Sequence, residues 1–300
     1  MSAIVSPPAE LSVIIVAYNS NEVILPCLDS LSESNTLGKG LDVVVVDNRP
    51  QAGLKDCLHE ADYTFHLQYV GSEKNVGFGG GNNLGVRYAL APYVLFLNPD
   101  TLVREDIYTP TLDRLRRDGN YVLGYSLTDP EGRRNYTYSY FPEYIYIFPL
   151  LQLLQHVSFR GSVNCVRPIN RIAWPWGAAI AMEKEAFLRA GGFDEHIFLC
   201  NEEPDLMRRL PKRRVYILPE HIVHLEGHGR EVSVGRYTAF LQSTDYYLRK
   251  YRVKSRWLYW KWVAMKLQVR RWMHCHVDKN YIEAFLQFRE NDLNSPSSNQ

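Results

Sequence analysis

Short apolar runs recur along the first third of the chain, and polar or glycine-containing segments separate them. The runs are LSVIIVA (11–17), LDVVVVDN (41–48), FHLQYV (65–70) and YVLFLNPD (93–100). Their lengths predict β-strands. The unbroken, β-branched runs at 11–17 and 41–48 predict strands that are buried on both faces.

The segments between these runs have helical patterns. Apolar residues recur at helical spacing over 24–31, after Asn and Ser cap candidates. Residues 54–61 show a weaker helical pattern, and a glycine-rich turn at 77–83 leads into a helix with the sequence NLGVRYALA. Alternation of strands and helices at this spacing predicts βαβ units, and therefore an α/β fold with a mostly parallel sheet.

The second half of the chain is less regular. Residues 125–172 are rich in aromatic residues, which we interpret as a loop-rich subdomain with a short helix near 147–157. The segment 174–187 predicts a strand and the start of a helix, and EEPDLMRRL predicts a helix with Pro204 in its first position. RVYILPEHIVHLEG predicts a last strand and a histidine-bearing loop, after which the chain is predicted to be helical from 236 to 288.

Composition limits the protein class. The 300 residues are 46% apolar, which is enough for a large core, and the formal net charge of +1 does not single out nucleic acid as a partner. Five cysteines without close pairs fit a reducing compartment. The first residues do not have the pattern of a signal peptide, and no uncharged apolar run reaches about 18 residues. We therefore expect a soluble, cytoplasmic protein.

Polar residues follow three of the predicted strands at the point where each strand ends. They are Ala17-Tyr18-Asn19, Asp47-Asn48 and Asn98-Pro99-Asp100. In open α/β sheets, ligands bind beyond the carboxyl ends of the strands. These three strand ends therefore predict one binding site at one edge of the sheet.

Two acids at these ends have alternative interpretations. Asp47 either caps the following turn or accepts the N3–H of a uracil or thymine base. Asp100 follows Pro99, which ends the strand, so it is either a turn residue or a metal ligand. Mg²⁺ or Mn²⁺ takes oxygen ligands and needs only one or two carboxylates when a diphosphate supplies the others.

The glycine-rich segment also leaves alternatives open. Gly77, Gly79, Gly80 and Gly81 form either a plain tight turn or a close backbone approach to a nucleotide. Position 82 is Asn, so the third glycine of the dinucleotide fingerprint is missing and NAD binding is only weakly indicated.

Three carboxylates, Glu202, Glu203 and Asp205, lie around a predicted helix N-terminus. They either complement the helix dipole, with Asp205 pairing with Arg209, or supply a general base. Mutual repulsion raises a carboxylate pKa and the helix end lowers it, so the sequence leaves the direction open. His224, in HLEGHG, is either a structural histidine or a second metal ligand near Asp100.

In this order, these motifs resemble those of an inverting family 2 glycosyltransferase with the GT-A fold. The motifs are LSVIIVAYNS, VVVVDN, NVGFGGGNNLG, LFLNPDT, WPWGA, GGFDEHIFLCNEEPDL and HLEGHG, within residues 11–250. The glycine-rich motif with LNPD and GGFDE is especially similar to the rhamnosyltransferase-like branch, which builds bacterial cell-surface polysaccharides.

The resemblance implies roles for individual residues. Those that would bind the nucleotide and sugar are Ala17, Tyr18, Asn19, Asp47, Asn75, Gly77, Gly81, Asn83, Asn98 and Asp100. Those that would bind the acceptor are Trp174, Trp176, Gly177 and Ala178. Asp100 and His224 would hold Mg²⁺ or Mn²⁺, and Glu203, with Glu202 and Asp205 beside it, would be the catalytic base.

The sequence departs from the family pattern at two places. Glu203 occupies the position where the family normally has an Asp base, so the base is longer by one methylene. Arg49-Pro50-Gln51 replaces the usual acidic turn after Asp47-Asn48. The implied mechanism is a single displacement: Glu203 takes the proton of an acceptor hydroxyl as it attacks the anomeric carbon, and the configuration inverts.

The implied organisation has four parts. They are an N-terminal arm (1–10), a catalytic domain (11–236, with a nucleotide-sugar half, 11–124, and an acceptor half, 125–236), a basic and aromatic helical region (237–290) and a disordered tail (291–300). Between Tyr246 and Val277 the chain has no acidic residue. Residues 247–276 therefore either cap the catalytic domain or bind an anionic membrane surface, which would place the protein on the inner face of the cytoplasmic membrane.

The leading functional hypothesis is an enzyme that transfers rhamnose from dTDP-rhamnose to a polysaccharide or lipid-linked acceptor. A UDP-sugar donor, for galactofuranosyl or glucosyl transfer, is the alternative within the family. A catalytically inactive nucleotide-sugar-binding protein is the alternative of another class, and an NAD-dependent oxidoreductase rests on the glycines alone.

Overall fold

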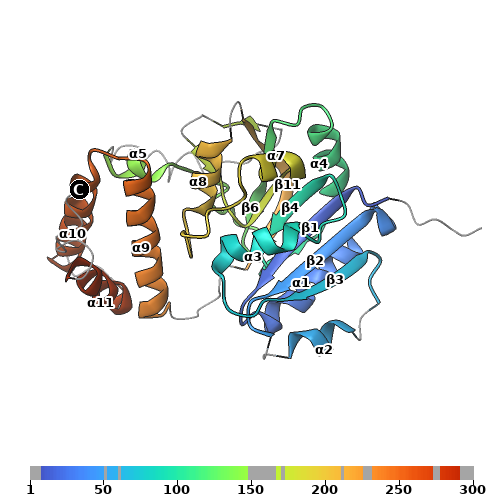
Figure 1. Ribbon diagram of the computed structural model, residues 1–300, viewed down its shortest axis with the longest axis horizontal. Helices are drawn as coiled ribbons and strands as arrows, with labels where there is room; N and C mark the ends of the chain where they lie inside the picture. Colours follow the sequence, from blue (N-terminus) through green and yellow to red (C-terminus); the bar gives the residue numbers. More distant parts are fainter. Residues whose placement is uncertain are drawn as a thin grey trace, which may run out of the picture.

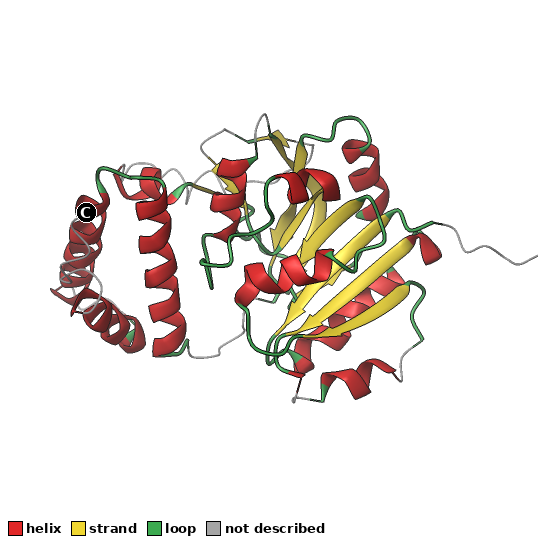
Figure 2. Ribbon diagram, viewed as in Figure 1, coloured by secondary structure: helices red, strands yellow, loops and turns green. Residues whose placement is uncertain are grey.

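The computed structural model describes residues 8–50, 53–59, 62–147, 167–169, 173–210, 213–225, 232–272 and 278–290. Within them, a large mixed sheet has helices on both faces, and a group of helices extends from one end (Figures 1 and 2). The strands are β1 (Leu11–Ala17), β2 (Leu41–Asp47), β3 (His66–Gly71), β4 (Tyr93–Leu97), β5 (Thr101–Val103), β6 (Tyr121–Thr128), β7 (Tyr138–Tyr140), β8 (Arg167–Pro168), β9 (Ala173–Pro175), β10 (Ala179–Glu183) and β11 (Arg214–His224). The helices are α1 (Asn21–Glu33), the 3₁₀ turn η1 (Gly38–Gly40), α2 (Leu54–His59), α3 (Gly77–Val86), α4 (Tyr108–Leu115), α5 (Pro142–Ile147), α7 (Lys184–Arg189), α8 (Glu202–Arg209), α9 (Val234–Lys250), α10 (Arg256–Trp272) and α11 (Lys279–Phe288).

The sheet contains nine of these strands in the order β3-β2-β1-β4-β10-β6-β11-β5, with β8 paired to β11. Strands β3, β2, β1 and β4 are parallel, as the sequence predicts. Strand β10 is antiparallel to both β4 and β6, because it starts at the carboxyl edge, where Ala179 pairs with Leu97. The parallel arrangement therefore holds in the N-terminal half, and the C-terminal half is mixed.

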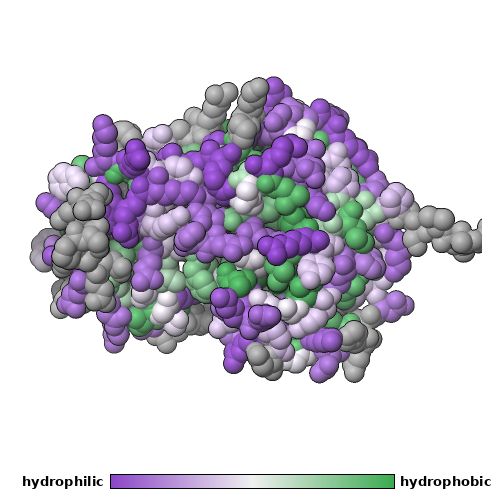
Figure 3. Space-filling model, viewed as in Figure 1, coloured by the Kyte–Doolittle hydropathy of each residue, from purple (hydrophilic) through white to green (hydrophobic). Residues whose placement is uncertain are grey.

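The core lies in two layers, one on each face of the sheet. Strands β1 and β2 are buried at every position, which confirms the reading of their unbroken apolar runs. One face packs against α1 and α4, and the other against α3, α7 and α8. On the face of the molecule seen in Figure 3, hydrophilic residues dominate and hydrophobic ones form small separate areas.

Helix α3 differs from the prediction because the glycines belong to the helix instead of preceding it. The helix starts at Gly77 and ends at Val86, so most of the predicted continuation, RYALA, lies beyond its end. Glycine disfavours helices, but this helix lies directly on the sheet. A Cβ on Gly81 would lie 2.6 Å from Val16, and one on Gly85 would lie 2.4 Å from Ile14. Close packing on the sheet therefore outweighs helix propensity.

Two other predictions on the second half can be compared with the structure. Strand β6 continues to Thr128, beyond the expected start of the irregular segment. Pro204 is the third residue of α8, not the first, because the helix already begins at Glu202. The predicted helix near 147–157 lies almost wholly outside the described residues, as do most of the arm at 1–10 and the tail at 291–300.

The predicted C-terminal helical stretch consists of α9, α10 and α11, which share a core of their own. Its buried residues are Leu241, Tyr247, Leu248, Tyr259, Trp260, Val263, Ala284, Phe285 and Phe288. Among the described residues, no helix combines the length and the apolar composition that crossing a bilayer requires.

Candidate active site

The carboxyl ends of β1 and β2 lie side by side. The Asn48 N–H donates to the Ala17 carbonyl over 2.8 Å, while Tyr18 is half exposed. Asn19 adopts a left-handed conformation with φ of 54°, and its side chain accepts a hydrogen bond from Arg49. A non-glycine residue in this conformation indicates a locally constrained turn. Arg49, which departs from the family pattern, is therefore part of this turn.

Asp47 is buried, and both of its oxygens accept hydrogen bonds within the protein. Oδ1 accepts the Arg49 N–H at 2.8 Å, and Oδ2 accepts the Tyr69 hydroxyl at 3.0 Å. The turn-capping interpretation is confirmed. Next to it lies a cavity of about 460 Å³, lined by Pro50, Lys55, Tyr69, Gly71, Ser72 and Glu73. Asp47 therefore fixes one wall of a cavity at the strand ends.

The N-terminus of α3 meets this edge through side-chain amides. Asn75 Oδ1 accepts the Gly77 N–H at 3.0 Å, and Asn48 Nδ2 donates to the Gly77 carbonyl at 3.0 Å. Gly77 itself has φ of 76°, and a Cβ there would lie 2.4 Å from the Phe198 carbonyl oxygen. Glycine at this position is therefore required both by conformation and by space.

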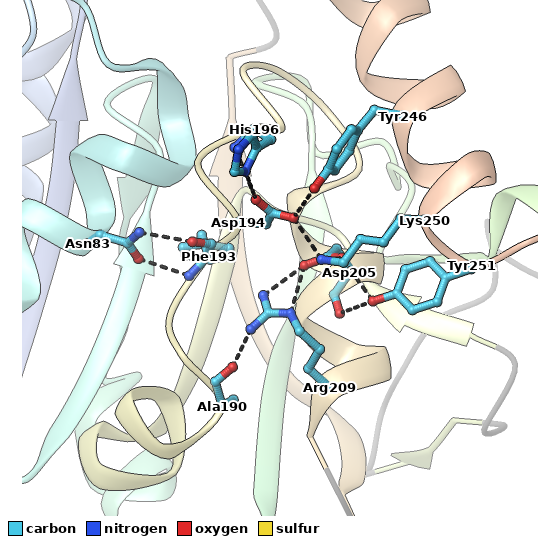
Figure 4. Close-up of polar contacts among 10 residues, drawn as sticks. All are labelled: Asn83, Ala190, Phe193, Asp194, His196, Asp205, Arg209, Tyr246, Lys250 and Tyr251. Atoms are coloured by element: carbon cyan, nitrogen blue, oxygen red, sulfur yellow. Dashed lines mark hydrogen bonds and ion pairs between the residues drawn. The ribbon is translucent and has the colours of Figure 1, made fainter. Parts of the chain in front are cut away.

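Asn83 lies away from the strand ends and joins α3 to the GGFDE turn (Figure 4). Its Nδ2 donates to the Phe193 carbonyl at 2.9 Å and to Glu195 at 3.0 Å, while its Oδ1 accepts the Phe193 N–H at 2.8 Å. The structure thus gives the Asn83 amide a bridging role between two segments.

Asp100 and His224, the two predicted metal ligands, lie next to each other. His224 Nε2 lies 3.3 Å from Asp100 Oδ1, because β5 and β11 pair in the register that sets Thr101 opposite His224. The other ring nitrogen, Nδ1, is buried without a hydrogen-bond partner. The pair offers one oxygen and one nitrogen, which suit Mn²⁺ or Mg²⁺ with a diphosphate completing the shell. Within the described ranges, no cluster of three or more His, Cys, Asp or Glu side chains forms a complete protein metal site.

The LNPD and WPWGA segments lie beside each other at the same edge. The Asn98 N–H donates to the Ala178 carbonyl at 2.9 Å, which extends the β4–β10 pairing. The indoles of Trp174 and Trp176 stack with centroids 5.6 Å apart, and Trp174 Nε1 donates to the Tyr140 carbonyl at 3.2 Å. Backbone pairing therefore brings the expected acceptor segment next to the expected nucleotide segment.

Glu203 is directly against this acceptor segment. A Cβ built on Gly177 would lie only 1.7 Å from Glu203 Oε1, so the carboxylate occupies the space that a side chain at 177 would need. Glu203 is only 9% exposed, and burial raises its pKa to about 7. A carboxylate with this pKa can accept a proton near neutral pH.

Glu202 completes a buried pair of carboxyls. Burial, and next the charge of Glu203, raise the pKa of Glu202 well above its ordinary value. Its Oε1 is buried without a hydrogen-bond partner, and a Cβ on Gly79 would lie 3.4 Å from its Cγ. The sequence left open whether these pKa values are raised or lowered. In the structure they are raised, because the effect of burial is larger than that of the helix N-terminus.

The approach to α8 is constrained. Cys200 and Asn201 have φ values of 65° and 71°, so two consecutive non-glycine residues are left-handed just before the carboxylate pair. Asn201 Nδ2 donates to the Thr244 hydroxyl of α9 at 3.0 Å. Strained backbone of this kind persists where the surroundings fix it, often at functional sites.

Asp205 belongs to a polar network that joins α8 to the end of α9 (Figure 4). It is fully buried and pairs with Arg209, which confirms the i,i+4 interpretation, and with Lys250. The Tyr251 hydroxyl donates to it at 2.8 Å. Lys250 also lies 2.7 Å from Asp194, so one ammonium joins the GGFDE turn to α8. All of this indicates a positioning role for Asp205.

Sequence reasoning missed the residues that hold this network together, chiefly Asp194, Lys250 and Tyr251. The acid-free stretch after Tyr246 indicated that basic residues gather there. Their partners are 45 to 56 residues earlier in the chain, and no local periodicity shows such pairing.

The structure thus assembles most of the predicted residues around one edge of the sheet. The strand ends at Asn19 and Asp47, the Asp100–His224 pair, the WPWGA segment and Glu203 belong to that edge. This edge of the α/β sheet therefore combines an adjacent carboxylate and imidazole with a buried carboxyl of raised pKa.

Comparison with known proteins identifies the family of this chain. The model of glycosyl transferase family 2 matches residues 12–173, more than half of the chain, and the chain belongs to that family. Rhamnosyltransferase WbbL of Escherichia coli K12 is 27% identical over 262 residues, which cover 81% of this chain and 94% of the relative. The chain is therefore a glycosyltransferase of the hexosyltransferase class.

Solved structures confirm the GT-A type of fold. Staphylococcus aureus TarS 1–349 with UDP has a TM-score of 0.51 and 16% identity, over 79% of this chain and 64% of that one. The mannosyltransferase PcManGT of Pyrobaculum calidifontis, with GDP-Man and Mn²⁺, has a TM-score of 0.53 and 18% identity, over 81% and 66%. At these identities the likeness shows the fold alone.

Proposed function

We propose that the protein is an inverting glycosyltransferase in which Glu203 is the base and the Asp100–His224 pair lies at the donor diphosphate. The observation that carries this proposal is the contact between Glu203 and Gly177. It sets a carboxylate of raised pKa against the segment expected to bind the acceptor. Asn98 and Ala178, which are hydrogen-bonded, link that segment to the LNPD strand end.

In this mechanism Glu203 accepts the proton of an acceptor hydroxyl, and the hydroxyl oxygen forms a bond to the anomeric carbon. The bond from that carbon to the diphosphate oxygen breaks at the same time, so the configuration inverts. Asp100 and His224 would hold Mn²⁺ or Mg²⁺, which when bound neutralises the charge of the departing diphosphate. The raised pKa of Glu202 favours its neutral form, which lowers the negative charge beside Glu203.

We further propose dTDP-rhamnose as the donor and a hydroxyl of a polysaccharide or lipid-linked saccharide as the acceptor. The rhamnosyl group is supported by the E. coli relative, which is a rhamnosyltransferase and is matched over 94% of its length. A UDP-sugar is the alternative donor, since TarS was solved with UDP. The cavity beside Asp47 and Tyr69 is the proposed place of the base.

A thermal-shift screen with dTDP-, UDP- and GDP-sugars, each with and without Mn²⁺, tests the donor. We expect stabilisation by dTDP-rhamnose that increases with Mn²⁺. Release of the nucleoside diphosphate in the presence of an acceptor extract then tests transfer, and Asp100→Ala should abolish it. Binding of a donor with no transfer to any acceptor would instead support an inactive nucleotide-sugar-binding protein.

A further inference from the structure

Helix α10 has two faces with different surroundings. Tyr259, Trp260 and Val263 are buried in the core shared with α9 and α11. Trp260 Nε1 also donates to Asp245 at 2.7 Å. The opposite face carries large apolar side chains that are exposed to solvent, namely Trp257, Leu258, Met265, Val269 and Trp272. The aromatic side chains of α10 therefore differ in surroundings, since Tyr259 and Trp260 pack against α9 and α11 while Trp257 and Trp272 are exposed.

The exposed residues form one stripe. At about 100° per residue, positions 258, 265, 269 and 272 fall on one side of a helix, with 257 at its border. Trp257 is 56% exposed and Trp272 is 81% exposed, so neither caps the rest of the protein. A contiguous apolar stripe of this kind on a surface helix is typical of an interaction site.

Charge identifies the kind of partner. The stretch between Tyr246 and Val277 has no acidic residue. Arg249 and Arg256 pair with the buried Asp245, as Lys250 does with Asp194 and Asp205. Of the remaining basic residues in the described part of the chain, Lys261 lies beside the apolar stripe by the same helical spacing, Lys266 lies at its other border, and Lys254 is exposed just before the helix begins.

Two of these lysines lie over indole rings of α10, namely the exposed ring of Trp257 and the partly buried ring of Trp262. Lys261 Nζ lies 4.8 Å from the centroid of Trp257, and Lys266 Nζ lies 5.1 Å from that of Trp262. Indole rings with ammonium groups beside them suit the boundary of a bilayer, where the ring enters the headgroup layer and the charge meets lipid phosphate. An acidic protein groove would match the charge but not the breadth of the apolar stripe.

We propose that this face of α10, defined by Trp257, Leu258, Met265, Val269 and Trp272, docks flat on an anionic lipid bilayer, together with Lys261 and with Lys254 just before the helix. The helix would lie in the plane of the surface, with its apolar stripe at the level of the acyl boundary. Helices α10 and α11 are at the end of the molecule opposite β3 (Figure 1), so docking there leaves the sheet and its carboxyl edge outside the lipid. This inference does not depend on transferase activity.

Co-sedimentation of the full chain with vesicles tests the proposal. The chain should bind vesicles that contain phosphatidylglycerol, bind phosphatidylcholine vesicles much more weakly, and bind less as salt is added. Each lysine near an anionic surface strengthens binding about fivefold, so the double variant Lys254→Gln/Lys261→Gln should bind about thirtyfold more weakly. The double variant Trp257→Ser/Trp272→Ser should lose binding at low salt and at high salt.

Matched variants serve as controls, because Arg117 and Leu286 are exposed outside this face. Arg117→Gln and Leu286→Ser should bind like the parent, and the unfolding temperature should show that every variant is folded. Two results would overturn the proposal: parent protein that ignores anionic vesicles, or lipid binding that survives both double variants. Light scattering that shows a dimer which Trp257→Ser/Trp272→Ser converts to a monomer would instead make this face an interface between two copies.

Discussion

Gly177→Ala is the substitution for which the structure predicts the size of the effect on kcat most directly. The added Cβ would lie 1.7 Å from Glu203 Oε1, whereas real Cβ atoms do not approach other heavy atoms within 3.0 Å. The two atoms must therefore separate by at least 3.0 − 1.7 = 1.3 Å, and the carboxylate, as the flexible end of its side chain, is the group expected to move. A displacement of about 1 Å in a catalytic group can reduce the rate about a hundredfold. We expect kcat to fall by about that factor, because the base no longer reaches the acceptor hydroxyl.

Steady-state kinetics of nucleoside diphosphate release, with donor affinity from calorimetry, measure this effect. Donor affinity should change little, since Gly177 adjoins the base and the acceptor segment. Gly235→Ala is the matched control, because a Cβ there meets no atom within 4 Å, and it should leave kcat unchanged. A Gly177→Ala variant with the parent's kcat would refute the placement of the Glu203 carboxylate.

Three further predictions concern acidity, the network and the metal. The rate should fall as pH drops through about 7, because Glu203, whose pKa is raised to about 7, must be ionised to act as a base. The same raised pKa means that the folded protein loses stability as pH rises from 4.5 to 7, so Glu203→Gln should melt higher than the parent above pH 7 and no higher near pH 4.5. Lys250→Met leaves Asp194 and Asp205 without their shared cation and should destabilise the fold by about 3 kcal/mol, measured by urea unfolding, whereas the exposed Lys279→Met should have almost no effect. EDTA should abolish transfer, and His224→Gln should raise the Mn²⁺ concentration needed for half-maximal rate; an EDTA-insensitive rate would exclude metal dependence.

The fold could be predicted where local pattern and burial agree. The β-branched runs at 11–17 and 41–48 are strands because both of their faces are covered, and the hydrophobic pattern records that directly. The start of α3 could not be predicted, because the reason for helix at Gly77–Gly81 is contact with Val16 and Phe193 on other elements. Likewise, the antiparallel direction of β10 depends on where the chain returns to the sheet.

The site residues divide in the same way, into those that local sequence predicts and those that depend on distant partners. Asp100 and His224 were predicted to lie near each other, and they do so because Asp100 comes just before β5 and His224 ends the antiparallel strand β11. The roles of Asn83 and Asp205 depend on partners far along the chain, Phe193 for one and Lys250 for the other. Likewise, the sequence could not show that the pKa of Glu203 is raised, because the shift comes from burial of the side chain.

The central claim is that Glu203 removes the acceptor proton. The most direct measurement is the turnover of Glu203→Gln in the transfer assay, at a donor concentration that saturates both proteins. We predict a loss of at least about a hundredfold with donor affinity retained, since glutamine keeps the shape but cannot accept the proton. Turnover equal to that of the parent would contradict the account.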